Sequence, residues 1–278
     1  MIVIEFVLLL LFGSLAAGIL GSIVGLGGGV IIIPILTIFL GVDIHYAIGA
    51  SIISVIATSS GAAATYVKDK MTNLRIGMFL ELATTTGAIL GAVVAVYLNS
   101  MILEIVFGSI LLVSLIPLVR KIGEDIPPKQ ELKGIAKTLS LSGEYKERDG
   151  STIQYNATNP KAGLSGMFAA GLISGLLGIG SGTFKVISMD VAMKLPMKVS
   201  TTTSNFMIGV TAAASAGIYY VRGDIDPFIA APVALGILVG SFIGTRILLR
   251  VRNAAVRRIF AIVLALSAIE MILRAAGI

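Results

Sequence analysis

Apolar runs of about twenty residues recur along the chain, and they limit it to folds whose helices cross a membrane. A bilayer core about 30 Å thick needs about twenty apolar residues per helical span, and each span must satisfy its own backbone polar groups. The chain has 278 residues, of which 56% are hydrophobic and 13% charged. Apolar runs lie at 2–24, 46–67, 76–98, 102–119, 163–176, 201–221, 228–249 and 259–273. The sequence therefore predicts an all-α polytopic membrane protein.

Charge and cysteine content narrow the function classes. The formal net charge is +6, but the basic residues cluster between the apolar runs, where they set membrane orientation rather than bind nucleic acid. The absence of cysteine excludes disulfides and thiolate chemistry. Asp224 and Asp226 share one loop, so they do not form the aspartate pair of an intramembrane protease, and no His and Glu cluster offers a metal site. We therefore expect no enzyme activity, no cofactor and no metal.

The sequence repeats itself at an offset of 153 residues. Without a gap, residues 16–66 align with 169–219 and match at ten of 51 positions, including three glycines of one cluster in each half. The stretch GAILG at 87–91 falls on GSFIG at 240–244 in the same register. Helices rich in Gly and Ala can also resemble each other through composition, but the persistent glycine spacing favours two homologous halves.

Loop charges predict opposite orientations for the two halves. The loop KDKMTNLR at 68–75 carries three cations, whereas its counterpart RGDIDP at 222–227 carries one. The loop NSM at 99–101 is uncharged, whereas its counterpart region at 250–258 carries four arginines. Because Lys and Arg concentrate on the cytoplasmic side, this exchange indicates an inverted-topology repeat, which many secondary transporters share. We expect about five helical segments per half with both termini outside; three full spans plus a re-entrant hairpin fit equally well.

A polar linker divides the chain into a first transmembrane repeat at 1–120, a cytoplasmic linker at 121–162 and a second repeat at 163–278. Within the linker, apolar and polar residues alternate on both sides of Asp149 and Gly150, a pair that suits a two-residue hairpin turn. We expect a small β-hairpin here. A solvated linker without structure is the alternative, since an isolated hairpin is marginally stable.

Glycine clusters interrupt two apolar segments at equivalent places in the repeat. GLGGGVIIIP begins at residue 25 and GIGSGTFKVI at residue 178, which predicts broken or re-entrant helices at 25–29 and 178–182. The N–H groups of a helix that starts at such a break carry partial positive charge and suit an anion. The predicted substrate-binding positions at the breaks are Gly27, Gly28, Gly29, Gly180, Ser181 and Gly182. Tight helix packing is the alternative explanation for the glycines.

Lys185 places a cation inside the apolar run after the second cluster. An unpaired cation in hydrocarbon costs roughly 2.5 to 3.5 kcal/mol or more, so it needs a partner or water. We expect Lys185 to attract the substrate. A structural ion pair, for which Asp190 is a candidate although a spacing of five points it away, and snorkelling to the interface are the alternatives.

Hydroxyl and amide side chains open the long helix after each short segment. AIGAS at 47–51 and STTTSN at 200–205 are equivalent under the repeat. Such side chains cap helix starts or donate hydrogen bonds to an oxyanion. We expect Ser51, Thr203, Ser204 and Asn205 to bind the substrate, with capping as the alternative.

Two further residues are candidates for proton coupling. Glu81 lies inside the apolar run 76–98, facing either a proton pathway or the headgroups. His45 precedes a long helix, and its side chain has an unperturbed pKa near neutral; an interfacial position is the alternative to a role in a proton relay.

Both halves of the chain resemble the TauE/SafE family of sulfite and organosulfonate exporters. The resemblance rests on GLGGGVIIIP and AIGAS in the first half and on GLLGIGSGTFKV, MKLPMKVSTTTSNFMIGVTAAAS and APVALGILVGSFIGTRI in the second. It implies a carrier of small sulfur-containing anions in the plasma membrane of a bacterium or archaeon. The family pattern has a glycine and a proline where this chain has Ser181 and Ile187, so a differently shaped second break is expected.

Together these features predict a secondary transporter that moves small anions by alternating access, coupled to protons through Glu81 or His45. The expected partners are a small anion and the lipid bilayer, and a homo-oligomer is left open. A passive anion channel is the alternative function.

Overall fold

The structure is a computed structural model that describes residues 3–24, 28–68, 72–119, 132, 134–146, 151–248 and 253–277. In these ranges the chain is helical apart from one two-stranded sheet and short connections, and it is an all-α membrane protein. Three described helices are long and apolar enough to cross a bilayer, with mean hydropathies of 2.2, 1.8 and 2.0: Ile4–Ser22, Leu74–Val96 and Pro227–Gly244. Shorter apolar helices lie at Gly29–Phe39, Ile44–Ser60 and Ser100–Ile116.

Each half contains the same series of elements. The first half has α1 (Val3–Val24), α2 (Gly29–Pro34), the π-helical turn η1 (Ile35–Phe39), α3 (Ile44–Lys68), α4 (Leu74–Val96) and α5 (Ser100–Val119). The second half has α7 (Pro160–Leu177), α8 (Gly182–Ile187), the π-helical turn η2 (Ser188–Ala192), α9 (Met197–Arg222), α10 (Pro227–Leu248) and α11 (Asn253–Ala275). The π-helical turn continues the short helix in each half, so five helical segments per half are present, as the repeat predicts.

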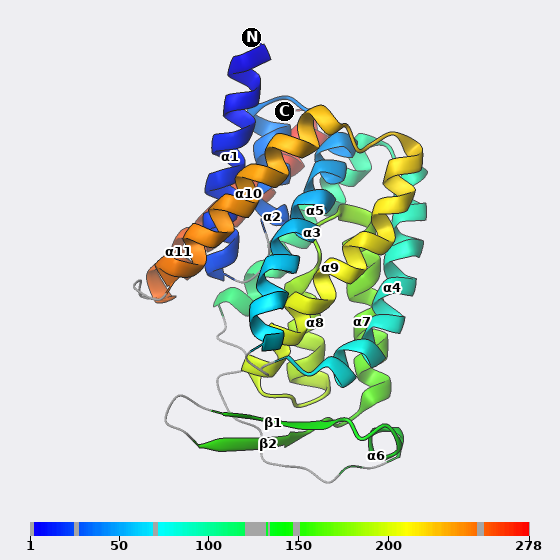
Figure 1. Ribbon diagram of the computed structural model, residues 1–278. Coiled ribbons are helices and arrows are strands. Elements are labelled where there is room, and N and C mark those ends of the chain that lie inside the picture. Colours follow the sequence, from blue (N-terminus) through cyan, green and yellow to red (C-terminus); the bar gives the residue numbers. More distant parts are fainter. Residues whose placement is uncertain are drawn as a thin grey trace.

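Both glycine clusters interrupt a helix and reverse its direction. In Figure 1, α1 runs inward from the end that carries both termini and α2 turns back toward that end, whereas α7 runs inward from the opposite end and α8 turns back there. Contacts support the second reversal: Ser188 Oγ donates to the Gly163 carbonyl oxygen at 3.1 Å, and the Thr158 N–H donates to the Met193 carbonyl oxygen at 2.9 Å. At about 1.5 Å per residue, neither short segment is long enough to cross a 30 Å hydrocarbon core, so both are re-entrant.

Helix packing is equivalent between the halves. The helix α1 packs along α10, and its repeat counterpart α7 packs along α4, while α3 pairs with α9 and α5 with α11 across the halves. The repeated glycines allow these close contacts, since an added Cβ on Gly91 would overlap the Leu172 carbonyl oxygen of α7 and one on Gly244 would overlap Ser22 Oγ of α1. This agreement supports two related halves. Their opposite orientation in the membrane stays a prediction.

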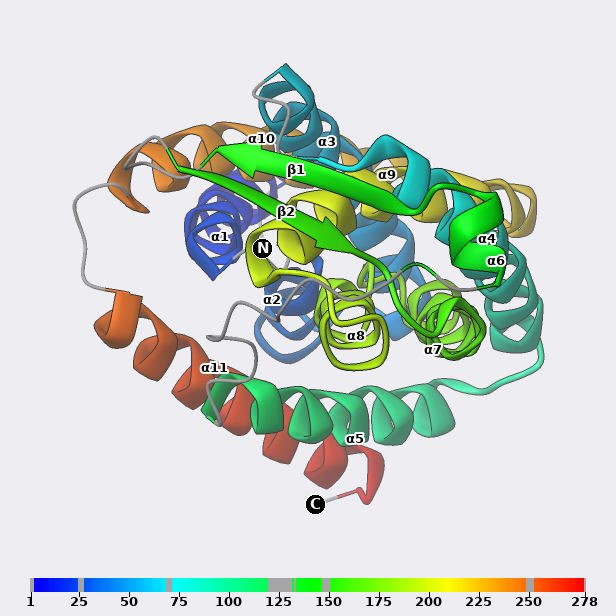
Figure 2. The same ribbon diagram turned by 90° about the horizontal axis from the view of Figure 1, so that it is seen from below.

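A β-hairpin covers one end of the helical bundle. Strands β1 (Ser142–Lys146) and β2 (Thr152–Asn156) pair antiparallel, with Ser142 opposite Asn156, and the short helix α6 (Ile135–Thr138) precedes them. The expected hairpin is therefore present, whereas its predicted turn at Asp149 and Gly150 lies outside the described residues. Figure 2, seen from below, shows both strands lying across the bundle, with α5 and α11 side by side along one edge.

The hairpin has a buried face that explains why it is folded. Tyr145 and Tyr155 pack with apolar residues from α4, η2 and α9, including Ile76, Met189 and Met207. The ring centroids of the two tyrosines lie 6.3 Å apart. Because an isolated hairpin is only marginally stable, this shared core stabilises it and fixes it against helices of both halves.

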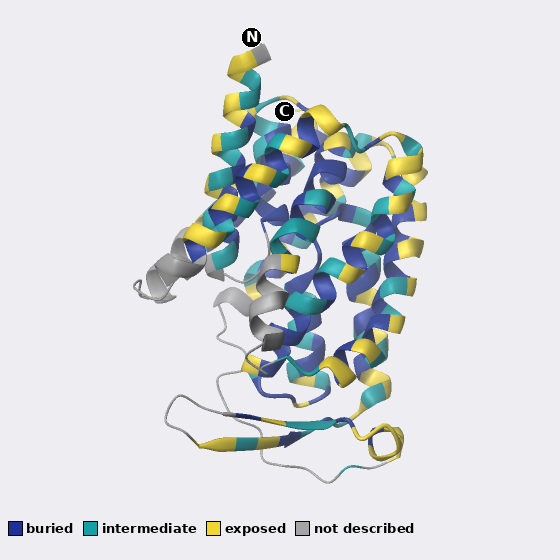
Figure 3. Ribbon diagram, in the orientation of Figure 1, coloured by how far each residue is buried: buried dark blue, intermediate teal, exposed yellow. Residues whose placement is uncertain are grey.

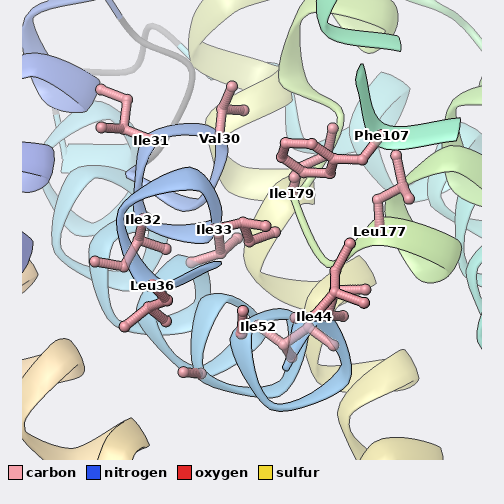
Figure 4. Close-up of a cluster of buried hydrophobic side chains, with 14 of the residues drawn as sticks. Val30, Ile31, Ile32, Ile33, Leu36, Ile44, Ile52, Phe107, Leu177 and Ile179 are labelled. Carbon is pink, nitrogen blue, oxygen red and sulfur yellow. The ribbon is translucent and has the colours of Figure 1, made fainter. Parts of the chain in front are cut away.

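Burial follows the helix faces expected for a membrane bundle. Figure 3 shows buried faces turned inward and exposed positions on the outer surfaces. The exposed side chains include large apolar ones such as Leu82 on α4 and Phe242 on α10, which suits contact with lipid. Figure 4 shows side chains of α2 and η1 gathered with Ile44 and Ile52 of α3, close to Leu177 and Ile179 of the second half.

Candidate functional site

The two glycine breaks lie against each other where the halves meet. An added Cβ on Gly29, the first residue of α2, would lie 3.4 Å from the carbonyl oxygen of Gly178, which ends α7. The same Cβ would lie 2.6 Å from Ser51 Oγ on α3. Ser51 Oγ donates a hydrogen bond to the Gly178 carbonyl oxygen at 2.8 Å. The start of α2, the helix α3 and the second break therefore meet at one point.

Several predicted glycines are required for packing at this junction. Gly28 lies against Ile237 of α10, so closely that an added Cβ would overlap that side chain. Gly180 has a φ of 71°, and its Cβ would lie 2.8 Å from Ile208 and 3.0 Å from Val55. Tight packing thus accounts for both glycines, while their contact with substrate stays a prediction. Gly27 lies outside the described residues.

The second break differs from the first at the residue before its short helix, in line with its departures from the family pattern: Gly28 has a φ of −72°, whereas Ser181 is left-handed. Each break is followed by a six-residue α-helix and a five-residue π-helical turn. Ser181 adopts a φ of 45°, a left-handed conformation that favours glycine, which explains the family's preference at this position. Its hydroxyl donates to the Ala170 carbonyl oxygen of α7 at 2.5 Å, so the side chain holds the break against α7.

The equivalent residues Ser51 and Ser204 both hold the second break. Ser204 Oγ on α9 donates to the Gly182 carbonyl oxygen at 3.2 Å, and Ser51 Oγ binds the Gly178 carbonyl oxygen. One serine comes from each half, and both are buried. In this conformation each hydroxyl hydrogen is engaged by backbone, so an anion would have to replace a carbonyl oxygen as its acceptor.

Thr203 and Asn205 lie differently although they flank Ser204. Thr203 Oγ1 accepts a hydrogen bond from the Asn73 N–H at 3.1 Å, so it faces the start of α4 and not the glycine break. Asn205 is half-buried and makes no hydrogen bond to any described residue, which leaves its amide available. Thr203 therefore serves helix packing here, and Asn205 stays a candidate for substrate contact.

Lys185 lies in the first turn of α8, where the sequence places it, and its N–H bonds to the Ser181 carbonyl oxygen at 3.1 Å. Its side chain is 0% exposed, which excludes snorkelling to the interface. Lys185 Nζ donates to Thr211 Oγ1 of α9 at 2.6 Å. No salt bridge joins Lys185 to the candidate Asp190 among the described residues, and the charged group that acts on Lys185 is Glu81.

Glu81 completes this buried network from the other half. It is 9% exposed and lies on the inner face of α4, so the headgroup alternative is wrong. Glu81 Oε1 lies 2.8 Å from Thr211 Oγ1 and accepts a hydrogen bond from Thr85 Oγ1 at 2.9 Å. Glu81 Oε2 is buried without a hydrogen-bond partner among the described residues. A single hydroxyl, that of Thr211, thus links a buried cation to a buried carboxylate.

Sequence reasoning missed Thr211 as a site residue. A threonine on an apolar helix is ordinarily satisfied by its own backbone, and Thr211 Oγ1 does lie 2.7 Å from the Met207 carbonyl oxygen. One signal was present: Thr211 is among the ten positions that match in the repeat, where its counterpart is Thr58.

His45 lies in a separate polar cluster at the end that carries the termini. Its Nδ1 is 2.8 Å from Asp43 Oδ1, and its Nε2 is 3.3 Å from the Leu98 carbonyl oxygen. Burial opposes ionisation of Asp43, but hydrogen bonds from His45 and Ser100 outweigh it and hold the pKa of this carboxyl below its usual value. The structure thus does not bring His45 and Glu81 into one hydrogen-bonded network, and His45 joins loops instead.

Comparison with known proteins places this geometry in a family. The family described as "Sulfite exporter TauE/SafE" matches residues 10–271. The chain is 28% identical over 275 residues to "Probable membrane transporter protein YunE" of Bacillus subtilis (strain 168), covering 96% of this chain and 97% of that protein. It is 25% identical over 230 residues to "Probable membrane transporter protein YdhB" of the same organism, covering 82% and 85%. No solved structure gives a significant match.

The match spans both glycine breaks, the buried lysine on α8 and its partners on α4 and α9. The match covers most of the chain, and the apolar helices of the bundle suit a bilayer, so sequence and structure agree on the family. The protein belongs to the TauE/SafE family of membrane transporters.

Proposed function

We propose that this protein is a secondary transporter that carries small anions, such as sulfite or an organosulfonate, across the plasma membrane of a bacterium or archaeon by alternating access. The observation that carries the proposal is Lys185, a fully buried cation beside the glycine break where the two halves meet. Burying a charge costs several kcal/mol unless a partner compensates it, so such a residue inside a membrane bundle marks a functional site.

The surroundings of Lys185 suit an anion with several oxygen atoms. The ammonium supplies positive charge, and the hydroxyls of Ser51 and Ser204, which hold the adjoining glycine break, supply hydrogen-bond donors without further charge. The Asn205 amide stays a further candidate donor. The name of the family points to sulfite as the substrate to test first.

The two halves must move relative to each other for an anion to reach Lys185. Lys185 is 0% exposed, so an anion reaches it only after α3 and α9 separate or tilt at the junction. Re-entrant segments that enter from opposite ends fit a rocking motion about a central site. Full burial of the lysine supports a carrier rather than a continuously open pore.

The test compares the uptake of radiolabelled sulfite into proteoliposomes that contain the wild type with uptake into those that contain the Lys185→Met variant. This change keeps a long, unbranched apolar stem but removes the charge. We therefore expect sulfite flux to fall at least about a hundredfold, toward the level of protein-free vesicles. The matched control is Lys161→Met on the exposed first turn of α7, which should transport as the wild type does.

Size-exclusion elution and thermal unfolding establish that both variants fold. Sulfite flux in a folded Lys185→Met variant equal to that of the wild type would overturn the role of Lys185. A passive channel is separated from a carrier by counterflow: a carrier transiently concentrates labelled sulfite against its gradient when the vesicles are preloaded, and a channel does not.

A further inference from the structure

We infer that the Thr211 hydroxyl couples anion binding at Lys185 to protonation of Glu81, so that an anion and a proton enter the site together. The inference rests on the proposed function and deepens it, because it assigns the direction of coupling and a positioning residue for it.

The Thr211 hydroxyl has one hydrogen and two acceptors within reach. Glu81 Oε1 lies 2.8 Å from Thr211 Oγ1, and the Met207 carbonyl oxygen lies 2.7 Å from it. Lys185 Nζ, which can only donate, occupies a lone pair of Oγ1 at 2.6 Å. The hydrogen is therefore free to turn toward either acceptor. An ionised Glu81 attracts it more strongly than a carbonyl does, because hydrogen bonds to charged acceptors are about twice as strong as those between neutral groups.

Charge balance determines what happens when an anion arrives. Lys185 and Glu81 are each other's only charged partners among the described residues, although the helix that carries Glu81 packs against α7 and α9. With both groups ionised, the buried site is neutral. A bound anion adds a negative charge beside a buried carboxylate, and repulsion at low dielectric is strong. Protonation of Glu81 removes that repulsion.

Glu81 has an oxygen available for the proton. Glu81 Oε1 accepts hydrogen bonds from Thr85 and Thr211, whereas Oε2 is buried without a hydrogen-bond partner in the described ranges. A proton from the bulk solution that binds Oε2 neutralises the carboxylate, and the Thr211 hydrogen then turns to the Met207 carbonyl oxygen. Lys185 loses its compensating charge and is left to bind the anion. One proton and one anion are bound, and no bond other than O–H forms.

The arrangement of a lysine, a threonine and a glutamate is present once and is not repeated at the equivalent positions. At the offset of 153 residues, Lys185, Glu81 and Thr211 correspond to Ile32, Ala234 and Thr58. Within the described part of the chain, Thr58 Oγ1 bonds only to carbonyl oxygens of its own helix, those of Ser54 and Val55. The described residues of the bundle thus hold a single charged pair of this kind, which predicts one proton for each anion.

The experiment measures accumulation of radiolabelled sulfite in proteoliposomes whose membrane potential is clamped at zero. Accumulation under an inward proton gradient of one pH unit is divided by accumulation at equal pH. Titration of sulfite itself contributes equally to every variant, so differences between variants report the protein. For one proton per anion, the coupled response is up to about tenfold in the wild type.

Thr211→Val removes the hydroxyl and should abolish the coupled response while labelled sulfite still exchanges at a reduced rate. Thr211→Ser restores the hydroxyl and should restore the response, and the matched control Thr58→Val should respond as the wild type does. A response in Thr211→Val equal to that of the wild type overturns the inference. If Thr211→Val does not exchange sulfite, Glu81→Gln takes its place, and a wild-type proton response in that variant overturns the inference.

The outcomes for the wild type separate the two proposals. Sulfite movement that exceeds that of protein-free vesicles but ignores the proton gradient overturns the coupling and leaves the transporter intact. No sulfite movement by the wild type, with or without a proton gradient, overturns the proposed function itself.

Discussion

Gly29 lies where two helices from one half and the break of the other half come together. Its missing side chain leaves room for Ser51 Oγ and for Val55, which an added Cβ would approach to 2.6 and 2.7 Å. Real Cβ atoms are not found at such distances, so a larger residue requires α2 or α3 to move. The Ser51 hydrogen bond to Gly178 depends on that spacing.

We expect Gly29→Ala to lower the free energy of unfolding by about 1 to 3 kcal/mol through overpacking, and to reduce sulfite transport. Thermal unfolding in detergent and flux in proteoliposomes measure the two effects. Gly217→Ala on α9 is the control, because an added Cβ there meets nothing within 4 Å and should be neutral or stabilise the helix by up to about 1 kcal/mol. Equal effects of the two substitutions would show that Gly29 has no special packing role.

The sequence does not show which of several neighbouring polar residues on α9 points toward the glycine break. Thr203, Ser204 and Asn205 are consecutive, and an α-helix turns them to different faces, about 100° apart. Ser204 binds the glycine break, while Thr203 accepts from Asn73 at the start of α4. No pattern in the stretch STTTSN distinguishes these faces, since its residues are all polar and similar in size. Predicting all three as substrate ligands therefore placed one on the wrong side of α9.

At the scale of elements, Asn73 connects three parts of the structure. Its side-chain oxygen caps α4 by accepting from the Ile76 N–H at 3.0 Å. Its amide nitrogen donates to the Ser142 carbonyl oxygen and to the Tyr155 hydroxyl of the hairpin at 3.1 and 3.0 Å. Its own N–H donates to Thr203 of α9. Burial raises the pKa of Tyr155 above its usual value despite the bond from Asn73, so the phenol stays neutral in its role as acceptor.

Asn73→Ala should cost about 1 to 2 kcal/mol of stability through the lost cap and should loosen the hairpin. Hydrogen exchange of the amides in β1 and β2 should become faster. Asn99→Ala is a matched control, because Asn99 caps α5 through the Ile102 N–H at 2.9 Å at the other end of the bundle. Faster exchange in the hairpin of both variants, or of neither, would contradict a specific tie through Asn73.

Element positions followed from the sequence better than the partners of the charged residues did. Glycine spacing, apolar length and the turn signal predicted the breaks, the long helices and the hairpin, because those features act locally. Glu81 and Lys185 belong to different halves and meet only through the packing of α4, α8 and α9. The residues next to them in sequence do not reveal that contact, so the sequence offered only Asp190, at an unfavourable spacing, as a candidate ion-pair partner for Lys185.

At the scale of the whole molecule, the halves are predicted to have opposite orientations. The hairpin lies at one end of the bundle, and the chain termini lie at the other (Figure 1). Near the termini, His45 and Asp43 of the first half lie close enough to Asp224 of the second half to affect its ionisation. Burial raises the pKa of Asp224 above its usual value, although Arg222 and His45 oppose the shift. The loop before α3 in the first half and the loop after α9 in the second half thus lie at the same end of the molecule, although they are not equivalent in the repeat.

Single cysteines test this orientation without background, since the chain has no cysteine of its own. Tyr97→Cys and Val221→Cys are exposed at the ends of α4 and α9 and should react with a membrane-impermeant maleimide in intact cells. Lys137→Cys, on exposed α6 beside the hairpin, should react only after the cells are permeabilised. Labelling of Tyr97→Cys and Val221→Cys from opposite sides of the membrane would rule out the inverted arrangement.

The two serines that hold the second break join different parts of the structure. This difference determines where the contact between the halves should open first. Ser204 connects α8 and α9, which belong to the same half, whereas Ser51 reaches across to Gly178. A rigid-body tilt of one half against the other stretches the Ser51 bond and spares the Ser204 bond. The junction should therefore part first between α3 and the C-terminal end of α7, and the re-entrant loop should travel with the second bundle as a single solid body.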